Sequence, residues 1–426
     1  MPLGTIVRLL ENHGRSREKV TIGCLNNLYK SVLDMNIDHF RSEACKKMLI
    51  YPKNAKEDQC RRLKINIDDK EATKCFMCPK SLEKKSCREF FSNFNTSRCS
   101  CGNLMDKEIP SSPEFEKMLG DSYEYDGVFV HGDGNMAFIV SDDMKIDNFS
   151  WDLFRKNVKD LGCVNLLDEI GEGEAEIDFR EAMTLLRSIF TSETPLTTTF
   201  FPFQSSSYPS KRAFKPSTTQ YDQVLGQVLS LKVYLSKHDK GKVVYVECGE
   251  GFIDLLCTFL VLPLEYVCEI FSASDDDGLG CIGNLFRSFK GLSCSEIAIP
   301  WYYSCRKNLL GITVQDPPPS FYHEDIHKHV TAMDPKTEMS GKTRSSGGFV
   351  KSNKKFLVSD DLRITPLSAD LTMRELKDLK ISFDDVTIEQ ITIGKAEAIN
   401  LLKSSFVTSS ALTNGLSDLF SKKLEG

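Results

Sequence analysis

The sequence predicts an α+β protein built from two tandem copies of one module, each a small sheet with packed helices. Similar blocks recur in the same order in both halves, short β-branched runs flank tight turns, and amphipathic helical patterns follow them. Apolar residues make up 41% and charged residues 27% of 426 positions, the balance of a folded globular protein. The formal net charge of −6 gives no overall attraction to nucleic acid or anionic lipid.

The first repeated block lies near the beginning of the chain. Residues 1–10 match residues 262–271, both with a Pro-Leu pair at positions two and three. The match continues from 23–31 (GCLNNLYKS) to 280–288 (GCIGNLFRS). A residue-for-residue match of this length indicates duplication.

Two further blocks follow in the same order. Residues 138–146 (FIVSDDMKI) match 356–364 (FLVSDDLRI), apolar runs around a Ser-Asp-Asp turn that predict a β-hairpin in each half. Residues 181–188 (EAMTLLRS) match 397–404 (EAINLLKS), each predicting an amphipathic helix, with a Leu-Thr pair a few residues later.

These repeats set the expected domain boundaries. We expect a first module over 1–202 and a second over 228–426. The Ser/Thr/Pro-rich stretch 203–227 has no periodicity and is interpreted as a linker. A similar stretch, 315–350, is expected to be a mobile insert within the second module.

The second copy begins with an element that the first lacks. Strand-like runs at 232–235 and 242–246 flank Asp239-Lys240-Gly241, which predicts a hairpin, and an apolar helix follows from Phe252. We therefore hypothesise that the chain is an N-terminally shortened form of a longer parent. Its first module would then have an uncovered sheet edge and apolar surface.

The helix after this hairpin could be mistaken for a membrane span. Asp254, Pro263 and Glu265 interrupt the apolar stretch 252–271, so the unbroken part is too short to cross a bilayer. We interpret it as a buried helix and expect no membrane partner.

Fifteen cysteines occur in the chain. Whether they form disulfides or stay reduced depends on the redox state of the compartment that holds the protein. No basic start, apolar run and small-residue cleavage site follow in order near Met1, so no secretory signal is predicted. We expect a cytoplasmic location, with the nucleus as a second compartment. In such reducing surroundings scattered cysteines behave as small apolar residues, and clustered ones are candidate metal ligands.

One cluster has the spacing of a structural zinc site. Cys75 and Cys78 form a C-x-x-C pair, and Cys99 and Cys101 form a C-x-C pair that Gly102 follows. Zinc in structural sites takes four thiolate or imidazole ligands in a tetrahedron, which two close pairs can supply. A glycine after a ligand permits a sharp turn that brings amide N–H groups toward the sulfurs.

The internal repeat leaves the fourth ligand open. Cys78 aligns with Cys305 of the second half, but Cys75 aligns with Tyr302. Cys87 lies between the two pairs and is the alternative to Cys75. The second half retains one cysteine of the set, so zinc is expected in the first half alone, as a structural cofactor that supplies folding energy.

The cysteine loop is also basic and aromatic. Its seven basic residues outnumber three acidic ones, and four phenylalanines lie among them. This composition leaves nucleic acid as an alternative partner, against a solvated loop whose aromatics pack around the metal. The basic and aromatic residues are Lys74, Lys80, Lys84, Lys85, Arg88, Arg98, Lys107, Phe76, Phe90, Phe91 and Phe94.

Three weaker motifs have simpler structural interpretations. His323 to His327 match the His-Glu-x-x-His pattern of zinc peptidases, but the surrounding sequence is typical of a linker. Gly249-Glu250-Gly251 is interpreted as a strand-to-helix turn, because the dinucleotide fingerprint needs a third glycine. The Ser-Asp-Asp sequences are interpreted as turn formers rather than cation sites. No catalytic residues are predicted.

In combination, these blocks identify a resemblance. The Leu-Pro-Leu block, Gly-Cys-x-x-Asn-Leu-Tyr-Lys-Ser, Cys-x-Cys-Gly, Ser-Asp-Asp-Leu and the closing Leu-Leu-Lys-Ser-Ser-Phe helix are similar to the plant family built on domain of unknown function 674. The resemblance implies tandem modules, an initial hairpin that is missing here, an aromatic residue in place of Cys75, and no established activity.

The chain is therefore expected to be a non-enzymatic interaction or scaffold protein with an unidentified protein partner. Two modules on a flexible linker allow one chain to hold two surfaces. Nucleic-acid binding by the loop 74–107 and an enzymatic role of unknown reaction remain as alternatives.

Overall fold

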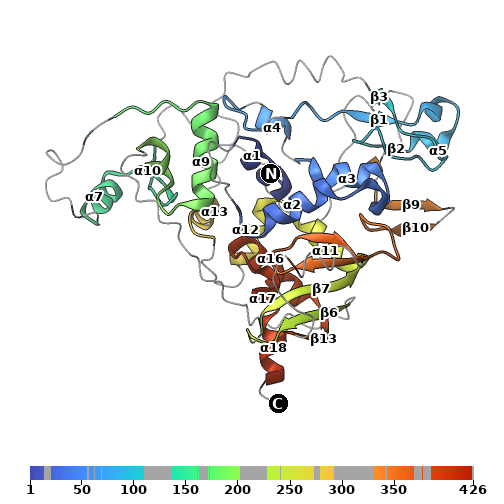
Figure 1. Ribbon diagram of the computed structural model, residues 1–426. Coiled ribbons are helices and arrows are strands. Elements are labelled where there is room, and N and C mark those ends of the chain that lie inside the picture. The colour runs from blue at the N-terminus through green and yellow to red at the C-terminus, as the bar shows by residue number, and fades with distance from the viewer. Residues whose placement is uncertain are drawn as a thin grey trace.

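Figure 1 shows the computed structural model of the chain. The structure describes residues 1–13, 21–54, 57–61, 63–68, 70–109, 137–160, 162, 171, 173–201, 228–239, 241–272, 279–291, 331–332, 334–340, 343–368, 377 and 385–424. The expected linker 203–227 and the His323 to His327 motif lie outside these residues.

Helices and small sheets alternate along the chain, which confirms the α+β class. The α-helices are α1 (Leu3–Asn12), α2 (Leu25–Asp34), α3 (Glu43–Ile50), α4 (Glu57–Arg61), α5 (Lys85–Arg88), α7 (Trp151–Asp160), α9 (Phe179–Thr191), α10 (Pro195–Phe200), α11 (Glu250–Val261), α12 (Leu264–Ser272), α13 (Cys281–Gly291), α16 (Lys395–Val407), α17 (Ala411–Gly415) and α18 (Ser417–Leu424), with 3-10 helices η1 (Ile37–His39) and η2 (Pro79–Leu82).

The strands form one larger sheet and several two-stranded ones. The five-stranded antiparallel sheet has the order β12-β11-β7-β6-β13, and the pairs are β1-β3, β4-β5, β9-β10 and the parallel β2-β8. The strands are β1 (Cys75–Met77), β2 (Phe90–Phe91), β3 (Lys107–Ile109), β4 (Phe138–Val140), β5 (Ile146–Asn148), β6 (Leu229–Ser236), β7 (Val243–Gly249), β8 (Thr331–Ala332), β9 (Thr337–Ser340), β10 (Thr343–Ser346), β11 (Lys355–Ser359), β12 (Ile364–Pro366) and β13 (Val386–Ile393).

The predicted hairpin of the second half forms the centre of the five-stranded sheet. Strands β6 and β7 pair antiparallel, and Lys242 N donates to Asp239 O at 3.1 Å to close the turn. Gly241 has φ +78°, a conformation that favours glycine. Strand β7 ends at Gly249 and α11 begins at Glu250, which confirms the strand-to-helix turn.

Helix α11 is the buried helix that the sequence predicts. Phe252, Leu256 and Leu260 lie in the core, with exposed fractions of at most 1%. No helix in the described part of the chain is long and apolar enough to cross a membrane.

The main core draws on both halves of the chain. Helices α1, α2 and α3 pack against α11, and their apolar residues join those of the five-stranded sheet in one cluster. Pro2 and Pro263 form an antiparallel bridge, in which Leu3 N donates to Leu262 O at 2.9 Å. The N-terminal helices of the first half therefore pack on α11, which lies against β7 and β11 of the second half (Figure 1).

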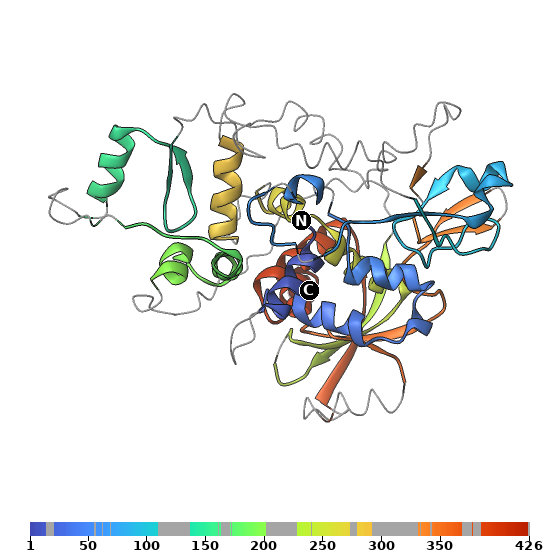
Figure 2. The ribbon, with the colours of Figure 1, turned by 90° about the horizontal axis from the view of Figure 1, so that it is seen from above.

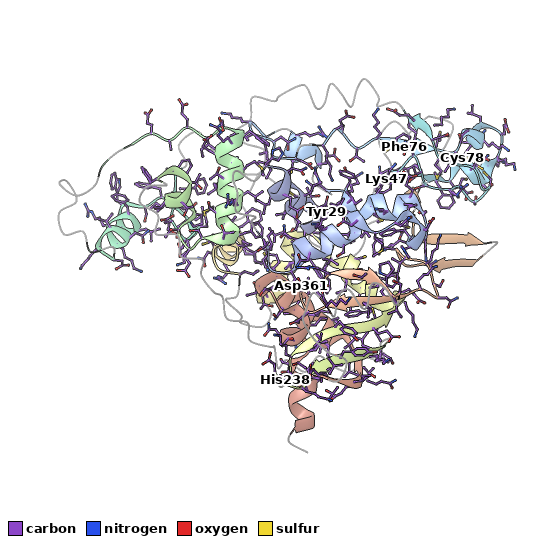
Figure 3. The ribbon with its side chains drawn as sticks, viewed as in Figure 1. Tyr29, Lys47, Phe76, Cys78, His238 and Asp361 are labelled. Carbon is purple, nitrogen blue, oxygen red and sulfur yellow. The ribbon has the colours of Figure 1, made fainter. Side chains whose placement is uncertain are left out.

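The helix α2 docks on the β11-β12 hairpin of the other half. Asn27 Nδ2 donates to the carbonyl oxygen and to Oδ2 of Asp361, both at 3.0 Å. Ile364 N donates to Ser31 Oγ at 3.0 Å. Figure 3 shows Asp361 beside the helix that carries Tyr29. The Ser-Asp-Asp turn thus receives a helix of the first half.

The matching contacts occur at the other end of the molecule. Asn284 Nδ2 of α13 donates to the carbonyl oxygen and to Oδ2 of Asp143, at 2.8 and 3.2 Å. Ile146 N donates to Ser288 Oγ at 2.9 Å. Figure 2 shows α13 standing beside the β4-β5 hairpin, away from the five-stranded sheet. Each half therefore provides a helix to the hairpin of the other half.

The first aspartate of each pair also has matching partners. Asp142 accepts from Thr197 N and Oγ1 at 3.0 and 2.6 Å, and Asp360 accepts from Thr413 N and Oγ1 at 2.7 and 2.9 Å. The aspartates are turn formers, as the sequence predicts, and they also fix the helices α10 and α17 through the repeated Leu-Thr pairs.

Candidate metal centre

The cysteine loop forms a small unit at one end of the molecule, where Figure 3 labels Phe76 and Cys78. Strands β1 and β3 pair antiparallel, with Phe76 opposite Glu108. A second connection runs through Phe76 N, which donates to Ser92 O at 2.7 Å, and Ser92 N, which donates to Phe76 O at 2.8 Å. These pairings hold the first and last parts of the loop together.

Each candidate ligand is positioned by a short turn or helix. Cys78 directly precedes η2, whose Ser81 N donates to Cys78 O at 2.9 Å. Cys87 lies within α5, which begins after the extended residue Lys84. Pro79 begins η2 because proline suits the first helical position. The two elements direct Cys78 and Cys87 into the same buried space.

The C-x-C pair lies in a tight turn. Cys99 N donates to Asn103 O, and Gly102 N donates to Cys99 O, both at 2.8 Å. Gly102 has φ +87°, so the sharp turn expected after Cys101 is present. Only glycine adopts this conformation without steric cost, and the turn brings both sulfurs to one side.

The turns bring four sulfurs together. The Sγ atoms of Cys78, Cys87, Cys99 and Cys101 lie within 4.8 Å of one another. Cys78 Sγ and Cys101 Sγ are 3.5 Å apart. Sulfur atoms around tetrahedral zinc at about 2.3 Å stand about 3.8 Å apart, so this group fits such an ion with small adjustments.

Cys75 is not a member of the group. It lies in β1, and Asn93 Nδ2 donates to its sulfur at 3.5 Å. The geometry therefore selects Cys87 rather than Cys75 beside the other three cysteines. Spacing alone favours Cys75, because it forms a C-x-x-C pair with Cys78. The pattern does not show that residues three positions apart in an extended segment point to opposite faces.

The surroundings of Cys78, Cys87 and Cys101 shift the pKa values of their thiols in different directions. Burial raises the pKa of the Cys87 thiol to about 12 and also raises the pKa of Cys78. The Asn103 amide, which hydrogen-bonds to the Cys101 sulfur, lowers the pKa of Cys101 to about 7. A bound cation would favour the thiolate forms, because neighbouring thiolates otherwise repel one another in this buried space.

A small apolar core surrounds the sulfurs. Phe90 and Met105 pack against the cysteines, and Phe91 is fully buried. Two of the loop's aromatic residues are therefore packing residues rather than exposed surfaces for bases. Strand β2, which carries them, pairs with β8 of the second half and joins the loop to the rest of the molecule.

The two arginines and the lysines between Cys78 and Cys87 differ in their contacts. Arg88 donates to the carbonyl oxygens of Ser81 and Leu82, and Arg98 donates to Gly102 O at 3.1 Å. These arginines stabilise the turns around the cysteines. The side chains of Lys80, Lys84 and Lys85 are exposed.

The donor set of the four-cysteine group has the composition of closed zinc sites in other proteins. All four candidate ligands are sulfurs, and neither histidine nor carboxylate belongs to the group. Four thiolates close the coordination sphere of zinc, whereas catalytic sites keep a position for water or substrate.

Comparison with known proteins places the chain in a family. A family model described as Protein of unknown function (DUF674) matches residues 1–396. The chain belongs to this family. The DUF674 match includes the four-cysteine group and both Ser-Asp-Asp hairpins, which confirms the resemblance to this family seen in the sequence. No curated protein and no solved structure matches.

Proposed function

We propose that this DUF674 protein is a non-enzymatic interaction or scaffold protein whose loop 75–109 is held folded by one structural zinc ion. The observation that carries the proposal is the group of four sulfurs within 4.8 Å of one another. Cys78, Cys87, Cys99 and Cys101 are the proposed ligands. The two halves, with their matching hairpin contacts, are proposed to be copies of one module.

The zinc would act on folding. The loop has few regular elements of its own, the longest being a helix and a 3-10 helix of four residues each. In small units of this kind the free energy of metal binding, about 10–16 kcal/mol in zinc-finger peptides, serves as folding energy. The amide N–H groups of Lys80 and Asn103, which hydrogen-bond to the sulfurs of Cys78 and Cys101, stabilise the thiolates.

A folded loop would present an exposed surface for a partner. Leu82 is 71% exposed and Leu104 is 40% exposed, both close to the ligands along the chain. Exposed leucines on a folded loop suit contact with another protein, because side chains that are already held in place lose less conformational freedom on binding.

Nucleic-acid binding is the second candidate. The exposed Lys80, Lys84 and Lys85 favour it, since phosphate contacts need accessible cations. The burial of Phe90 and Phe91 counts against stacking on bases, so protein is the preferred partner.

The test compares two cysteine variants. Cys87→Ser should abolish zinc binding and loop-dependent partner capture, whereas Cys75→Ser should retain both. Zinc is counted by native mass spectrometry, and partners are captured on immobilised protein with and without chelator. Turnover in a substrate screen that a single side-chain substitution abolishes would contradict a non-enzymatic role.

A further inference from the structure

The protein covers the members of the four-cysteine group unequally. Cys78 and Cys87 are fully buried and Cys99 is 5% exposed, whereas Cys101 is only partly buried. Cys101 directly precedes Gly102, where an added Cβ would meet no described atom within 4 Å. Among the four proposed ligands, Cys101 is therefore the most accessible to a small solute.

The sulfur of Cys101 also has a close neighbour from another part of the loop. Cys78 Sγ lies 3.5 Å from Cys101 Sγ, and Cys78 belongs to the start of η2 rather than to the C-x-C turn. The sulfurs of a disulfide are about 2.05 Å apart, so the two atoms need to approach by about 1.5 Å to form one. Cys78 is thus placed to react with a modified Cys101.

This arrangement matches what oxidation of a cysteine requires. Hydroperoxides react with the thiolate form, and ligation to zinc keeps cysteines as thiolates. Cysteines that respond to oxidants are accessible and lie next to a second cysteine that resolves the first product as a disulfide. Cys101 has the accessibility, and Cys78 is the neighbour.

We infer that Cys101 is an oxidation site at which a hydroperoxide expels the proposed zinc ion, because Cys101 and Cys78 become joined in a disulfide. The inference rests on the proposed zinc site and names its regulation.

The reaction has two steps. First, the Cys101 thiolate attacks one oxygen of hydrogen peroxide, the O–O bond breaks, and a sulfenic acid forms as hydroxide leaves. Second, the Cys78 thiolate attacks this sulfur, the S–S bond forms, and the S–O bond breaks with loss of a second hydroxide. The two thiolates lose two electrons, which the peroxide accepts. Only Cys87 and Cys99 then remain as thiolate ligands, fewer than a structural zinc site needs.

Loss of the ion would act on the part of the loop that carries Leu82. Helix α5 has four residues, and its Cys87 is the one that belongs to the sulfur group. A single helical turn is not stable by itself, so α5 depends on this attachment. Arg88 of α5 donates to the carbonyl oxygens of Ser81 and Leu82. Release of α5 therefore removes the support of the exposed Leu82, and oxidation would switch off the proposed partner surface.

The experiment uses the zinc-loaded full chain and hydrogen peroxide. A chromogenic indicator follows zinc release, and tandem mass spectrometry maps disulfides after free thiols are blocked. We expect about one zinc ion released per peroxide consumed. The tryptic peptides 75–80 and 99–107 should be joined through Cys78 and Cys101. A dithiol reductant with added zinc should restore the loaded chain.

Two histidine substitutions provide a matched pair of variants. Cys101→His retains a ligand that zinc accepts but removes the accessible thiol, so zinc release by peroxide should slow at least about tenfold. Cys99→His keeps the Cys101 thiol and should release zinc at nearly the native rate. Hydrogen exchange at the amides of 81–88 should rise when the native chain is oxidised and should stay unchanged in Cys101→His.

Four outcomes would overturn the inference. They are zinc retained in excess peroxide, zinc lost without a disulfide between Cys78 and Cys101, a loss that the reductant and zinc do not reverse, and equal peroxide sensitivity of Cys101→His and the native chain. If Cys101→His does not bind zinc, the disulfide map of the native chain decides.

Failure of this inference is distinguishable from failure of the proposed function. A chain that carries no zinc before peroxide is added would contradict the proposed zinc site itself. A chain that carries zinc and keeps it in peroxide would contradict the oxidation site alone.

Discussion

The contact between α2 and the β11-β12 hairpin can be tested by replacing one hydrogen-bond donor with an acceptor. In Asn27→Asp a carboxylate replaces the amide that donates twice to Asp361, at 3.0 Å each. A hydrogen bond to a charged group contributes about 1.5–3 kcal/mol and one to a carbonyl about 0.5–1.5 kcal/mol. The new carboxylate also faces an existing one, and both residues are partly exposed.

We therefore expect Asn27→Asp to lower the free energy of unfolding by about 2–4 kcal/mol. A cooperative unit of roughly 150–250 residues loses about 2–4 °C of Tm per kcal/mol, which gives a decrease of about 4–16 °C. Differential scanning calorimetry and urea unfolding measure both quantities. Asn36→Asp is the matched control, because Asn36 is exposed and its Oδ1 accepts from Asp38 N, a role that aspartate retains.

The double variant Asn27→Asp with Asp361→Asn restores a donor to the pair and should recover most of the loss. A decrease below about 0.5 kcal/mol for Asn27→Asp would refute the docking of α2 on this hairpin, since surface substitutions without a structural role fall in that range. Asn284→Asp should reproduce the loss at the matching contact with Asp143.

Two further predictions concern a backbone position and the basic loop. Gly23 has φ +50°, and a Cβ there would stand 2.3 Å from Ser405 O. Gly23→Ala should therefore lower the free energy of unfolding, measured in urea, by about 3 kcal/mol or more. An unchanged free energy would contradict the packing of this turn on α16. Single-stranded oligonucleotides should bind weakly, with Kd about 10⁻⁴–10⁻⁶ M at physiological salt, and neutralising Lys80, Lys84 and Lys85 should flatten the salt dependence. Nanomolar binding with a flat salt response in fluorescence anisotropy would contradict the burial of the loop aromatics.

Local patterns in the sequence predict several individual elements. The β6-β7 hairpin, the buried helix α11, both Ser-Asp-Asp hairpins and the cluster around Cys99 are all present where the periodicity and turn residues place them. These features depend on interactions between residues close in the chain, which the sequence states directly.

The exchange of helices between halves could not be predicted in this way. The sequences around Asn27 and Asn284 are similar, as are the two hairpins that receive them, so local pattern does not decide which helix binds which hairpin. The close packing of Gly4 against Leu260 O, where a Cβ would stand 3.0 Å away, shows how tightly α1 fits the second half. That fit is a tertiary property of the whole chain.

The choice of the fourth cysteine shows the same limit of prediction from local sequence pattern. Cys87 joins the group through α5, and Cys75 faces Asn93, although Cys75 has the better spacing along the chain. The mismatch between Cys75 and Tyr302 in the internal repeat was the one signal in the residues themselves that favoured Cys87.

Metal content is the most direct test of the central proposal, a zinc-stabilised loop. Native mass spectrometry of the purified chain should show one zinc ion, absent after chelation and in Cys87→Ser but retained in Cys75→Ser, with a lower Tm whenever zinc is lost. A metal-free chain whose melting profile is unchanged by chelator, or a zinc ion that depends on Cys75 and not on Cys87, would contradict the account.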